Sequence, residues 1–213
     1  MTTIQGFSFN AISRHTAQSN QASLRLASGQ RINSSADDAA GLSISEGMRS
    51  QIRGMNQASQ NAAIGQTMLN KADGVMGIVN EMLQRVRELK VQGANDTMSD
   101  RDRSIIAIEI YHLTEGIGDI ARNTSWNGMN IFSPPSVGGV AGTDIRLQVG
   151  ANSSQSMKFS FPDLYTNIFQ ALSAQNASTD WSSASSISSA ISKIDDLLAF
   201  LNGSRAGLSS NPV

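Results

Sequence analysis

The sequence contains no cysteine, which excludes disulfide bonds, thiolate catalysis and cysteine-ligated zinc sites. Histidine is almost as scarce: His15 and His112 lie far apart, and no metal-ligand spacing surrounds either of them. The chain also lacks a His-Glu-x-x-His motif and a glycine-rich phosphate loop. We therefore expect no catalytic site, no metal site and no cofactor.

Charged residues are sparse as well, at 15% of the chain, where about a quarter is usual. The formal net charge is −1, and the basic residues form no cluster of the kind that binds nucleic acid. Asparagine, glutamine, serine and alanine replace the missing charges. Copies of such a chain can pack together without burying many ions, so the composition favours association with other protein.

Long apolar runs are also absent. No stretch approaches the roughly 18 apolar residues that cross a bilayer. The amino-terminal segment lacks the basic start and the apolar run of a signal peptide. We therefore expect a soluble chain with no membrane insertion and no cleaved leader.

Apolar residues at helical spacing dominate residues 37–92, a segment without proline. From Leu69 to Val86 they follow steps of 3, 4, 3, 4 and 3 residues, which is typical of a heptad seam. A second stripe from Met68 to Leu89 runs beside the first, and the combined face is too broad for a two-stranded coil. The pattern predicts one long helix, over about residues 37–92, packed in a bundle.

Capping signals flank this helix. Ser34 to Asp38 read as a capping serine followed by carboxylates in the first helical turn, which explains Asp37-Asp38 better than a catalytic pair does. Ser99 to Asp102 resemble a capping box and predict a second helix over about residues 100–121. The link between the two helices is short, so we expect them to lie antiparallel.

The remaining third of the chain mixes strands and helices. Apolar residues alternate on both sides of a turn at Gly150–Ser154, which predicts a β-hairpin over about residues 144–161. Residues 133–139 read as a loop, residues 163–174 as a short helix and residues 182–202 as a further helix. The predicted fold is mainly α: a long antiparallel helical bundle, or rod, with one small β-hairpin.

Two domains are expected: an amino-terminal arm over residues 1–36, partly disordered, and a rod domain over residues 37–213. The predicted core of the bundle contains Leu69, Met76, Val79, Leu83, Val86, Ile106, Leu113 and Ile117. Several glycines lie inside the long helix, where each costs about 1 kcal/mol relative to alanine. They either permit close approach of a neighbouring backbone or are merely tolerated: Gly47, Gly54, Gly65, Gly74 and Gly77.

A family resemblance rests on the same segments. Residues 25–42, Arg-Leu-Ala-Ser-Gly-Gln-Arg-Ile-Asn-Ser-Ser-Ala-Asp-Asp-Ala-Ala-Gly-Leu, resemble the amino-terminal signature of the bacterial flagellins. Further similar segments follow in the family's order and extend the likeness over most of residues 20–205: Leu83–Leu89, Val91–Asn95, Trp126–Gly128, Gln148–Asn152 and Ile191–Asp195.

The resemblance implies a structural subunit that self-assembles with other flagellin subunits into the flagellar filament for motility. It also implies secretion through the flagellar export machinery, with a chaperone, to an extracellular filament. Flagellins continue into a long final helix beyond the position of Val213, and that helix pairs with the amino-terminal arm. We therefore expect an apolar face of the long helix to lack its usual partner within this sequence, and we expect residues 1–35 to be poorly ordered.

Flagellins are also sensed by Toll-like receptor 5, and the positions that match its binding site are Arg85, Leu89 and Glu109. Each has another interpretation. Arg85 follows Glu81 by four residues and can form a surface ion pair, Leu89 extends an apolar stripe, and Glu109 can be a solvated acid.

Two other functions stay open. A hook–filament junction protein would share the helical ends of the chain. A surface adhesin on the same scaffold would bind glycans through a concave polar site with aromatic residues, for which Trp181, Tyr165 and Phe169 are the candidates.

Overall fold

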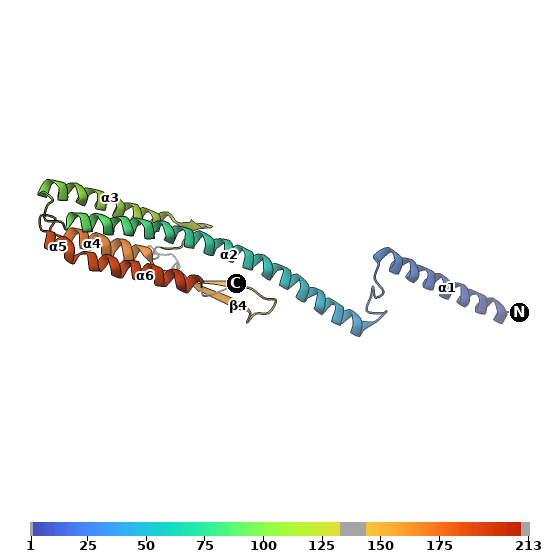
Figure 1. Ribbon diagram of the computed structural model, residues 1–213. Helices are drawn as coiled ribbons and strands as arrows, with labels where there is room; N and C mark the ends of the chain where they lie inside the picture. The colour runs from blue at the N-terminus through green and yellow to red at the C-terminus, as the bar shows by residue number, and fades with distance from the viewer. Residues whose placement is uncertain (1, 133–143, 210–213) are drawn as a thin grey trace. The chain divides into compact units, whose positions relative to one another are not determined.

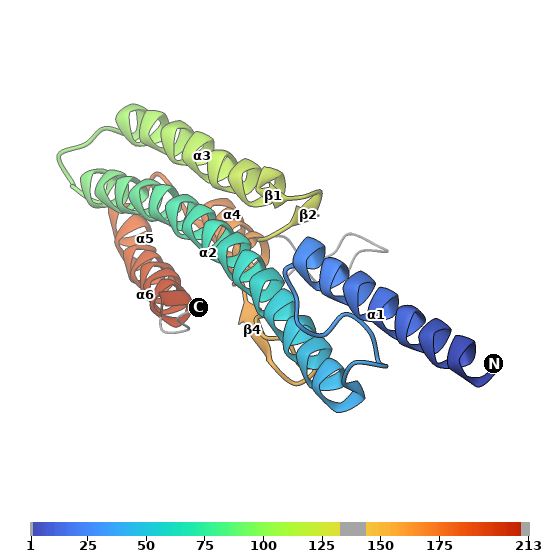
Figure 2. The same cartoon turned by 90° about the vertical axis from the view of Figure 1, so that its right-hand side faces the viewer.

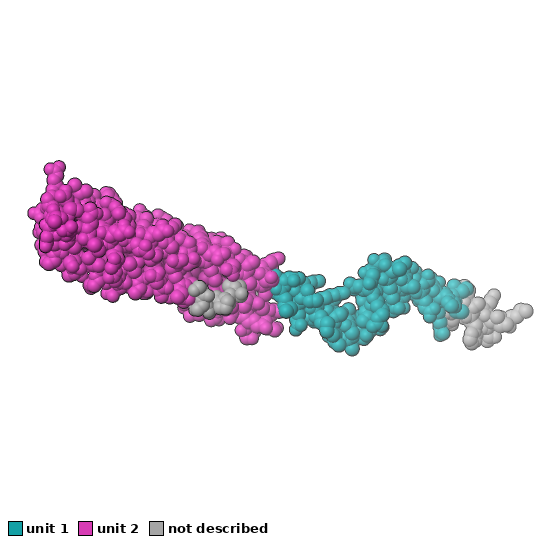
Figure 3. Space-filling view, in the orientation of Figure 1, with its two compact units in different colours: residues 1–56 teal, residues 57–213 magenta. Residues whose placement is uncertain are grey.

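The computed structural model describes residues 2–132 and 144–209, so the loop expected at residues 133–139 lies outside the described residues. The chain divides into two units, residues 1–56 and residues 57–213, which Figure 3 shows in different colours. The units meet within helix α2, between Asn56 and Gln57, whereas the expected domains meet between residues 36 and 37.

The first unit contains helix α1, Thr2–Ser28, and the beginning of helix α2, Ala39–Gly93. Gly29 ends α1 with a φ of +65°, a left-handed conformation that glycine adopts without a steric penalty. A helix in the amino-terminal arm was not among the sequence predictions. Partial disorder of this arm in solution stays a prediction.

Asp37 organises the turn between α1 and α2. Its carboxylate accepts hydrogen bonds from the backbone N–H groups of Asn33 and Ser34, each at 3.2 Å. The side chains of Gln21 and Arg25 donate to the same carboxylate. The hydrogen bond from the Asn33 backbone is the largest of the effects that lower the pKa of Asp37. This turn is therefore held by charge-assisted hydrogen bonds.

The cap of α2 corrects the sequence prediction. Asp38, and not a serine, occupies the capping position, because its Oδ1 accepts from the backbone N–H of Gly41 at 2.9 Å. The helix begins at Ala39 and has no acidic residue in its first turn. The predicted first-turn carboxylate, Asp37, is committed to the preceding turn instead.

The second unit is an antiparallel bundle around the rest of α2, and this confirms the predicted fold class (Figures 1 and 2). Helix α3, Asp100–Asn123, follows α2 after a short link and opens with the predicted capping box of Ser99 and Asp102. The π-helix η1, Tyr165–Gln170, leads into α4, Ala171–Ser178. The last helical segment is broken into α5, Ala184–Ser189, and α6, Ile191–Ser209.

Two small antiparallel hairpins complete the fold. Strand β3, Asp144–Gln148, pairs with β4, Ser156–Ser160, in the register Ile145 opposite Phe159. A shorter hairpin of β1, Ser125–Trp126, and β2, Met129–Asn130, was not predicted. Its Asn127-Gly128 turn has φ values of 49° and 79°, which is typical of a type I′ turn.

The core of the second unit follows the seam of α2. Six of the eight predicted core residues are at most 6% exposed, whereas Leu69 and Leu113 are half-buried at its margin. Met68, rather than Leu69, carries the seam at its amino-terminal end, with 4% exposure. Residues of the later helices and of the β3–β4 hairpin, together with Phe132, pack over the seam, including Ile110, Phe159, Ile168, Leu172, Ile194 and Leu201.

Some glycines of α2 permit close approach of a neighbouring segment, and others are merely tolerated in the helix. A Cβ at Gly65 would overlap Leu147 Cδ1 of β3, so this glycine permits the hairpin to approach the helix. Asn61 Nδ2 donates to the backbone oxygen of Gln148 at 3.0 Å beside it. By contrast, Gly47, Gly74 and Gly77 face open space, so close approach explains only part of the set.

Candidate interaction surfaces

An apolar stripe of α2 lies on the surface in the first unit. Ile44, Met48, Ile52 and Met55 follow one another at steps of 4, 4 and 3 residues and are between 57% and 63% exposed. The stripe continues into the buried seam through Ala58, which is 5% exposed. The same helical face is therefore covered in one unit and uncovered among the described residues of the other.

Helix α1 adds to this apolar surface. Ile12, Leu24 and Leu26 are 65%, 62% and 88% exposed. Single exposed apolar residues are normal in soluble proteins, but a run of them along both helices of one unit is not. The stripe from Ile44 to Met55, which lies on one face of α2, is the feature that marks a site of protein association.

Of the three positions matched to receptor recognition, Arg85 and Glu109 form an ion pair and Leu89 is buried. Arg85 Nη2 lies 2.8 Å from Glu109 Oε1, and Arg85 Nη1 lies 3.3 Å from Glu88 Oε2. The hydrogen bond to Glu109 is the main cause that raises the pKa of Arg85. Arg85 therefore pairs with Glu109 and Glu88, and not with Glu81 as the sequence suggested. Leu89 is 2% exposed and belongs to the core, so of the three matched positions only Arg85 and Glu109 reach the surface.

Lys90 is a buried cation that the sequence analysis missed. It lies four residues after Val86 on the seam, its exposure is 0%, and its Nζ donates to Gln175 Oε1 at 2.9 Å. No salt bridge among the described residues includes Lys90, and burial lowers its pKa from 10.5 to about 8. The sequence analysis looked only for apolar residues at the seam positions and therefore omitted this lysine. Its place four residues after Val86, the next step of the heptad spacing, was the signal that could have identified it as buried.

Arg103 is a second buried cation, and it joins three segments at one end of the bundle. Its guanidinium donates to the backbone oxygens of Gly93 at 3.2 Å, Asn95 at 3.2 Å and Ser182 at 2.8 Å. The five fixed donors of arginine suit three separate carbonyl acceptors. The end of α2, the link to α3 and the segment before α5 are therefore held together by one side chain.

The aromatic candidates for a glycan site lie at the two ends of the helical segment formed by η1 and α4. Tyr165 and Phe169 pack against each other with ring centroids 5.0 Å apart, and the Arg122 guanidinium lies 5.3 Å from the Phe169 ring. Phe169 also packs against α3, since a Cβ at Gly118 would lie 2.6 Å from its ring. Trp181 follows α4, and its Nε1 donates to the backbone oxygen of Asn176 near the end of that helix at 3.3 Å. Glycan binding by these three residues stays a prediction.

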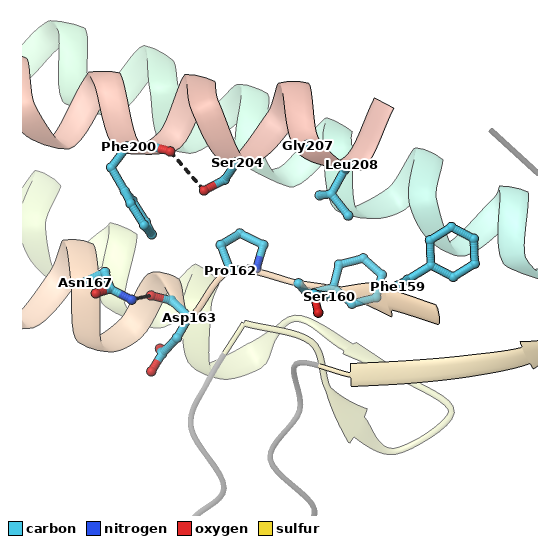
Figure 4. A pocket seen from close by; sticks show the side chains of 10 residues that line it. Phe159, Ser160, Pro162, Asp163, Asn167, Phe200, Ser204, Gly207 and Leu208 are labelled. Carbon is cyan, nitrogen blue, oxygen red and sulfur yellow. Dashed lines mark hydrogen bonds between the residues drawn. The ribbon is translucent and has the colours of Figure 1, made fainter. Parts of the chain in front are cut away.

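A shallow cavity of about 460 Å³ lies between α6, β4 and the start of η1 (Figure 4). Phe200 and Leu208 of α6 face Pro162 across it. The carboxylate of Asp163, at its edge, accepts from the backbone N–H of Thr166 at 2.9 Å and so belongs to the start of the helix.

Among the residues that the structure describes, no group of three or more His, Cys, Asp or Glu side chains could hold a metal ion. Nor is any described helix long and apolar enough to cross a membrane.

Residues 8–135 match the family of the bacterial flagellin N-terminal helical region. The chain is 35% identical over 188 residues to the flagellar filament 30.7 kDa core protein of Treponema maltophilum, which covers 86% of this chain and 66% of that protein. The chain therefore spans about two thirds of the length of the curated relatives that it matches first.

Solved structures share the fold. The flagellin of Bacillus cereus superposes with a TM-score of 0.59 at 24% identity, covering 71% of this chain and 80% of that chain. The Bacillus cereus protein FlgL superposes with a TM-score of 0.53 at 16% identity, covering 79% and 93%. At these identities the likeness concerns the fold alone.

The fold and its surfaces define a helical-bundle protein whose described residues carry an uncovered apolar stripe. The sequence matches are more specific than the fold. This chain belongs to the bacterial flagellin family, which is a family of flagellar structural proteins.

Proposed function

We propose that this chain is a structural subunit that assembles with other copies into an extracellular flagellar filament. The observation that carries the proposal is the exposed stripe of α2, Ile44 to Met55, which continues the seam that the chain buries elsewhere. A helical face with heptad spacing is stable when other helices cover it. Helices of neighbouring subunits can supply that cover.

The surface chemistry of the first unit supports assembly. Its helices expose apolar side chains, and charged residues make up only 15% of the whole chain. Burying such a surface removes apolar area from water at about 25 cal/mol per Å² without the desolvation of many ions. A filament of identical subunits needs surfaces of this kind, because each copy must be buried against several others.

Polymerisation of the purified chain tests the proposal. We expect salt or filament fragments to seed polymers that sediment and appear as filaments in electron micrographs. The double substitution Met48→Asp with Ile52→Asp places two charges in the proposed contact and should abolish the polymer, because buried unpaired charges are unfavourable by several kcal/mol.

Ser50→Asp is the matched control. Ser50 lies on the same turn of α2 but on the opposite face, and it is exposed. This variant should polymerise like the unmodified chain. If the chain forms no polymer under any seeding condition, or if the double variant polymerises normally, the proposal is wrong.

Secretion and receptor recognition belong to the same proposal. As a flagellin, the chain is expected to pass through the flagellar export machinery with a chaperone and to activate Toll-like receptor 5 through Arg85 and Glu109. Receptor reporter cells would measure the second part. Arg85→Ala and Glu109→Ala should each raise the concentration for half-maximal activation, and Leu89→Ala should act only through loss of stability.

The main alternative is a junction protein between hook and filament. The fold does not decide between the two functions, since two differently named Bacillus cereus proteins share it. The similarity to a filament core protein, which extends over most of the chain, favours the filament subunit. Electron microscopy of labelled cells separates them, because a junction protein would label only the base of each filament.

A further inference from the structure

A second apolar stripe lies on the outer face of α3. Ile105, Ile108 and Tyr111 are 58%, 57% and 57% exposed, and His112 contacts the Tyr111 ring edge at a centroid distance of 5.9 Å. The opposite face of α3 carries its buried residues, among them Ile106, Ile110 and Ile117. The bundle therefore uses one face of α3 and leaves a second apolar face in solvent.

The outer face of α3 has a symmetric arrangement about Ile108. At 100° per residue, the exposed positions Arg101, Ser104, Ile105, Tyr111 and His112 and the half-buried Glu115 all fall within roughly 60° of the direction of Ile108. Ile105 precedes Ile108 by the same three residues by which Tyr111 follows it. Arg101 and Glu115 lie seven residues away on either side, and they carry opposite charges.

This arrangement is self-complementary in an antiparallel pair. A two-fold axis through Ile108 places the Ile108 side chains of two copies against each other. It sets Ser104 and Ile105 of one copy beside Tyr111 and His112 of the other. It also brings each Arg101 to the Glu115 of the second copy, so both ends of the contact gain an ion pair.

The charges at the two ends are available for such pairs. Arg101 is exposed and forms no salt bridge among the described residues. Glu115 has only a distant partner, since its Oε2 lies 3.9 Å from Arg122 Nη2, and Arg122 is closer to Asp119 at 2.8 Å. Glu109 lies off the face and is already paired with Arg85.

From this symmetry and charge complementarity, we infer that the outer face of α3 binds a second copy of this chain in an antiparallel two-fold dimer. The dimer is distinct from the filament. A polar filament repeats one orientation of its subunit through head-to-tail contacts, whereas a two-fold contact reverses the helix direction. Three half-exposed apolar side chains per copy give a small interface, so the dimer is weak and forms at high concentrations of unassembled chain.

Sedimentation velocity at rising concentration of the full chain, after removal of sedimented polymer, tests the inference. We expect a monomer–dimer equilibrium. Ile108→Asp should weaken dimerisation at least tenfold, because it places two carboxylates against each other at the axis. The control Val91→Asp changes an exposed apolar residue of α2, 50% exposed, and should leave the dimerisation constant unchanged.

A charge exchange tests the register. Arg101→Glu and Glu115→Arg should each weaken the dimer by roughly two- to fivefold, since each places like charges at both ends of the contact. The double variant Arg101→Glu with Glu115→Arg should restore it. An unchanged constant in Ile108→Asp, or a double variant that is as weak as the single ones, overturns the inference.

Cross-linking gives an independent measurement, because the chain has no cysteine of its own. Ile108→Cys should form a covalent dimer with a short bismaleimide, whereas the Cys side chains of Ser104→Cys lie roughly 12 Å apart along the helices and should not. Equal cross-linking of both variants would contradict the pairing.

The double variant Met48→Asp with Ile52→Asp should still dimerise but should not form the polymer. Failure of the filament proposal and failure of this inference can therefore be told apart.

Discussion

The two halves of helix α2 carry one apolar seam in two different surroundings. Between Met68 and Val86 the seam residues are at most 4% exposed, whereas between Ile44 and Met55 they are at least 57% exposed. The spacing of apolar residues is the same in both halves. Hydrophobic periodicity therefore predicts that a face must be covered, but it does not predict whether the same chain supplies the cover.

The largest expected effect separates the two halves directly. Leu83→Asp buries an unpaired charge in the covered half and should lower the free energy of unfolding by more than about 4 kcal/mol. Met48→Asp introduces the same charge in the uncovered half and should change it by less than about 0.5 kcal/mol. Melting followed by circular dichroism measures both. An unchanged midpoint in Leu83→Asp would contradict the assigned core.

The next effect concerns Lys90, the one charged residue of the covered seam. Its ammonium is buried, and its pKa falls from 10.5 to about 8 in the folded chain. The unfolded chain therefore binds more protons between these values, so stability should rise from pH 8 to pH 10.5, by up to about 3 kcal/mol. Below pH 8 Lys90 is protonated in both the folded and the unfolded chain, so the full free-energy cost of burying its charge destabilises the folded chain there.

Lys90→Met tests this assignment. The variant should be more stable than the unmodified chain at pH 7 by about 1–2 kcal/mol, because loss of the hydrogen bond to Gln175 offsets part of the gain. The difference between the two proteins should shrink as pH rises above 8. Urea unfolding at several pH values measures it, and a difference that is constant from pH 7 to pH 10 would exclude Lys90 as the source.

The smallest effect compares two glycines of α2 in the second unit. Gly65→Ala should destabilise the chain by about 1 kcal/mol, because the new methyl group displaces Leu147 of the β3–β4 hairpin. Gly77→Ala faces open space and should stabilise it by up to about 1 kcal/mol through helix propensity. Thermal melting of the pair gives the sign of each change, and a stabilising Gly65→Ala would argue against close approach at that position.

Much of the fold could be predicted from the sequence because its elements are long and regular. The periodicity of α2 and α3, the capping box at Ser99 and the alternation of β3 and β4 are local signals, and each lies within one or two residues of the observed element. Core residues followed from the same periodicity. Leu69 packs at the margin of the core, because two apolar stripes run side by side there and Met68 is the more deeply buried residue.

The missed features depend on contacts between distant segments. Arg103 looks like an ordinary first-turn residue in the sequence, and only the fold brings Ser182 within 2.8 Å of it. The break between α5 and α6 falls in a serine-rich segment whose capping alternatives are nearly equivalent. Tyr165 and Phe169 pack against each other, whereas helix α4 lies between this pair and Trp181 in the chain. Sequence proximity is a poor guide to a binding site when a helix intervenes.

The hydrogen bonds around Asp37 have a consequence for the order of folding. Their donors lie at most 16 residues away along the chain, whereas Asn61 joins Gln148 across 87 residues and Arg87 joins Asp195 across 108. Closing a short loop costs less chain entropy than closing a long one. The turn between α1 and α2 can therefore form early and locally, while the bundle must wait until its last helix is available.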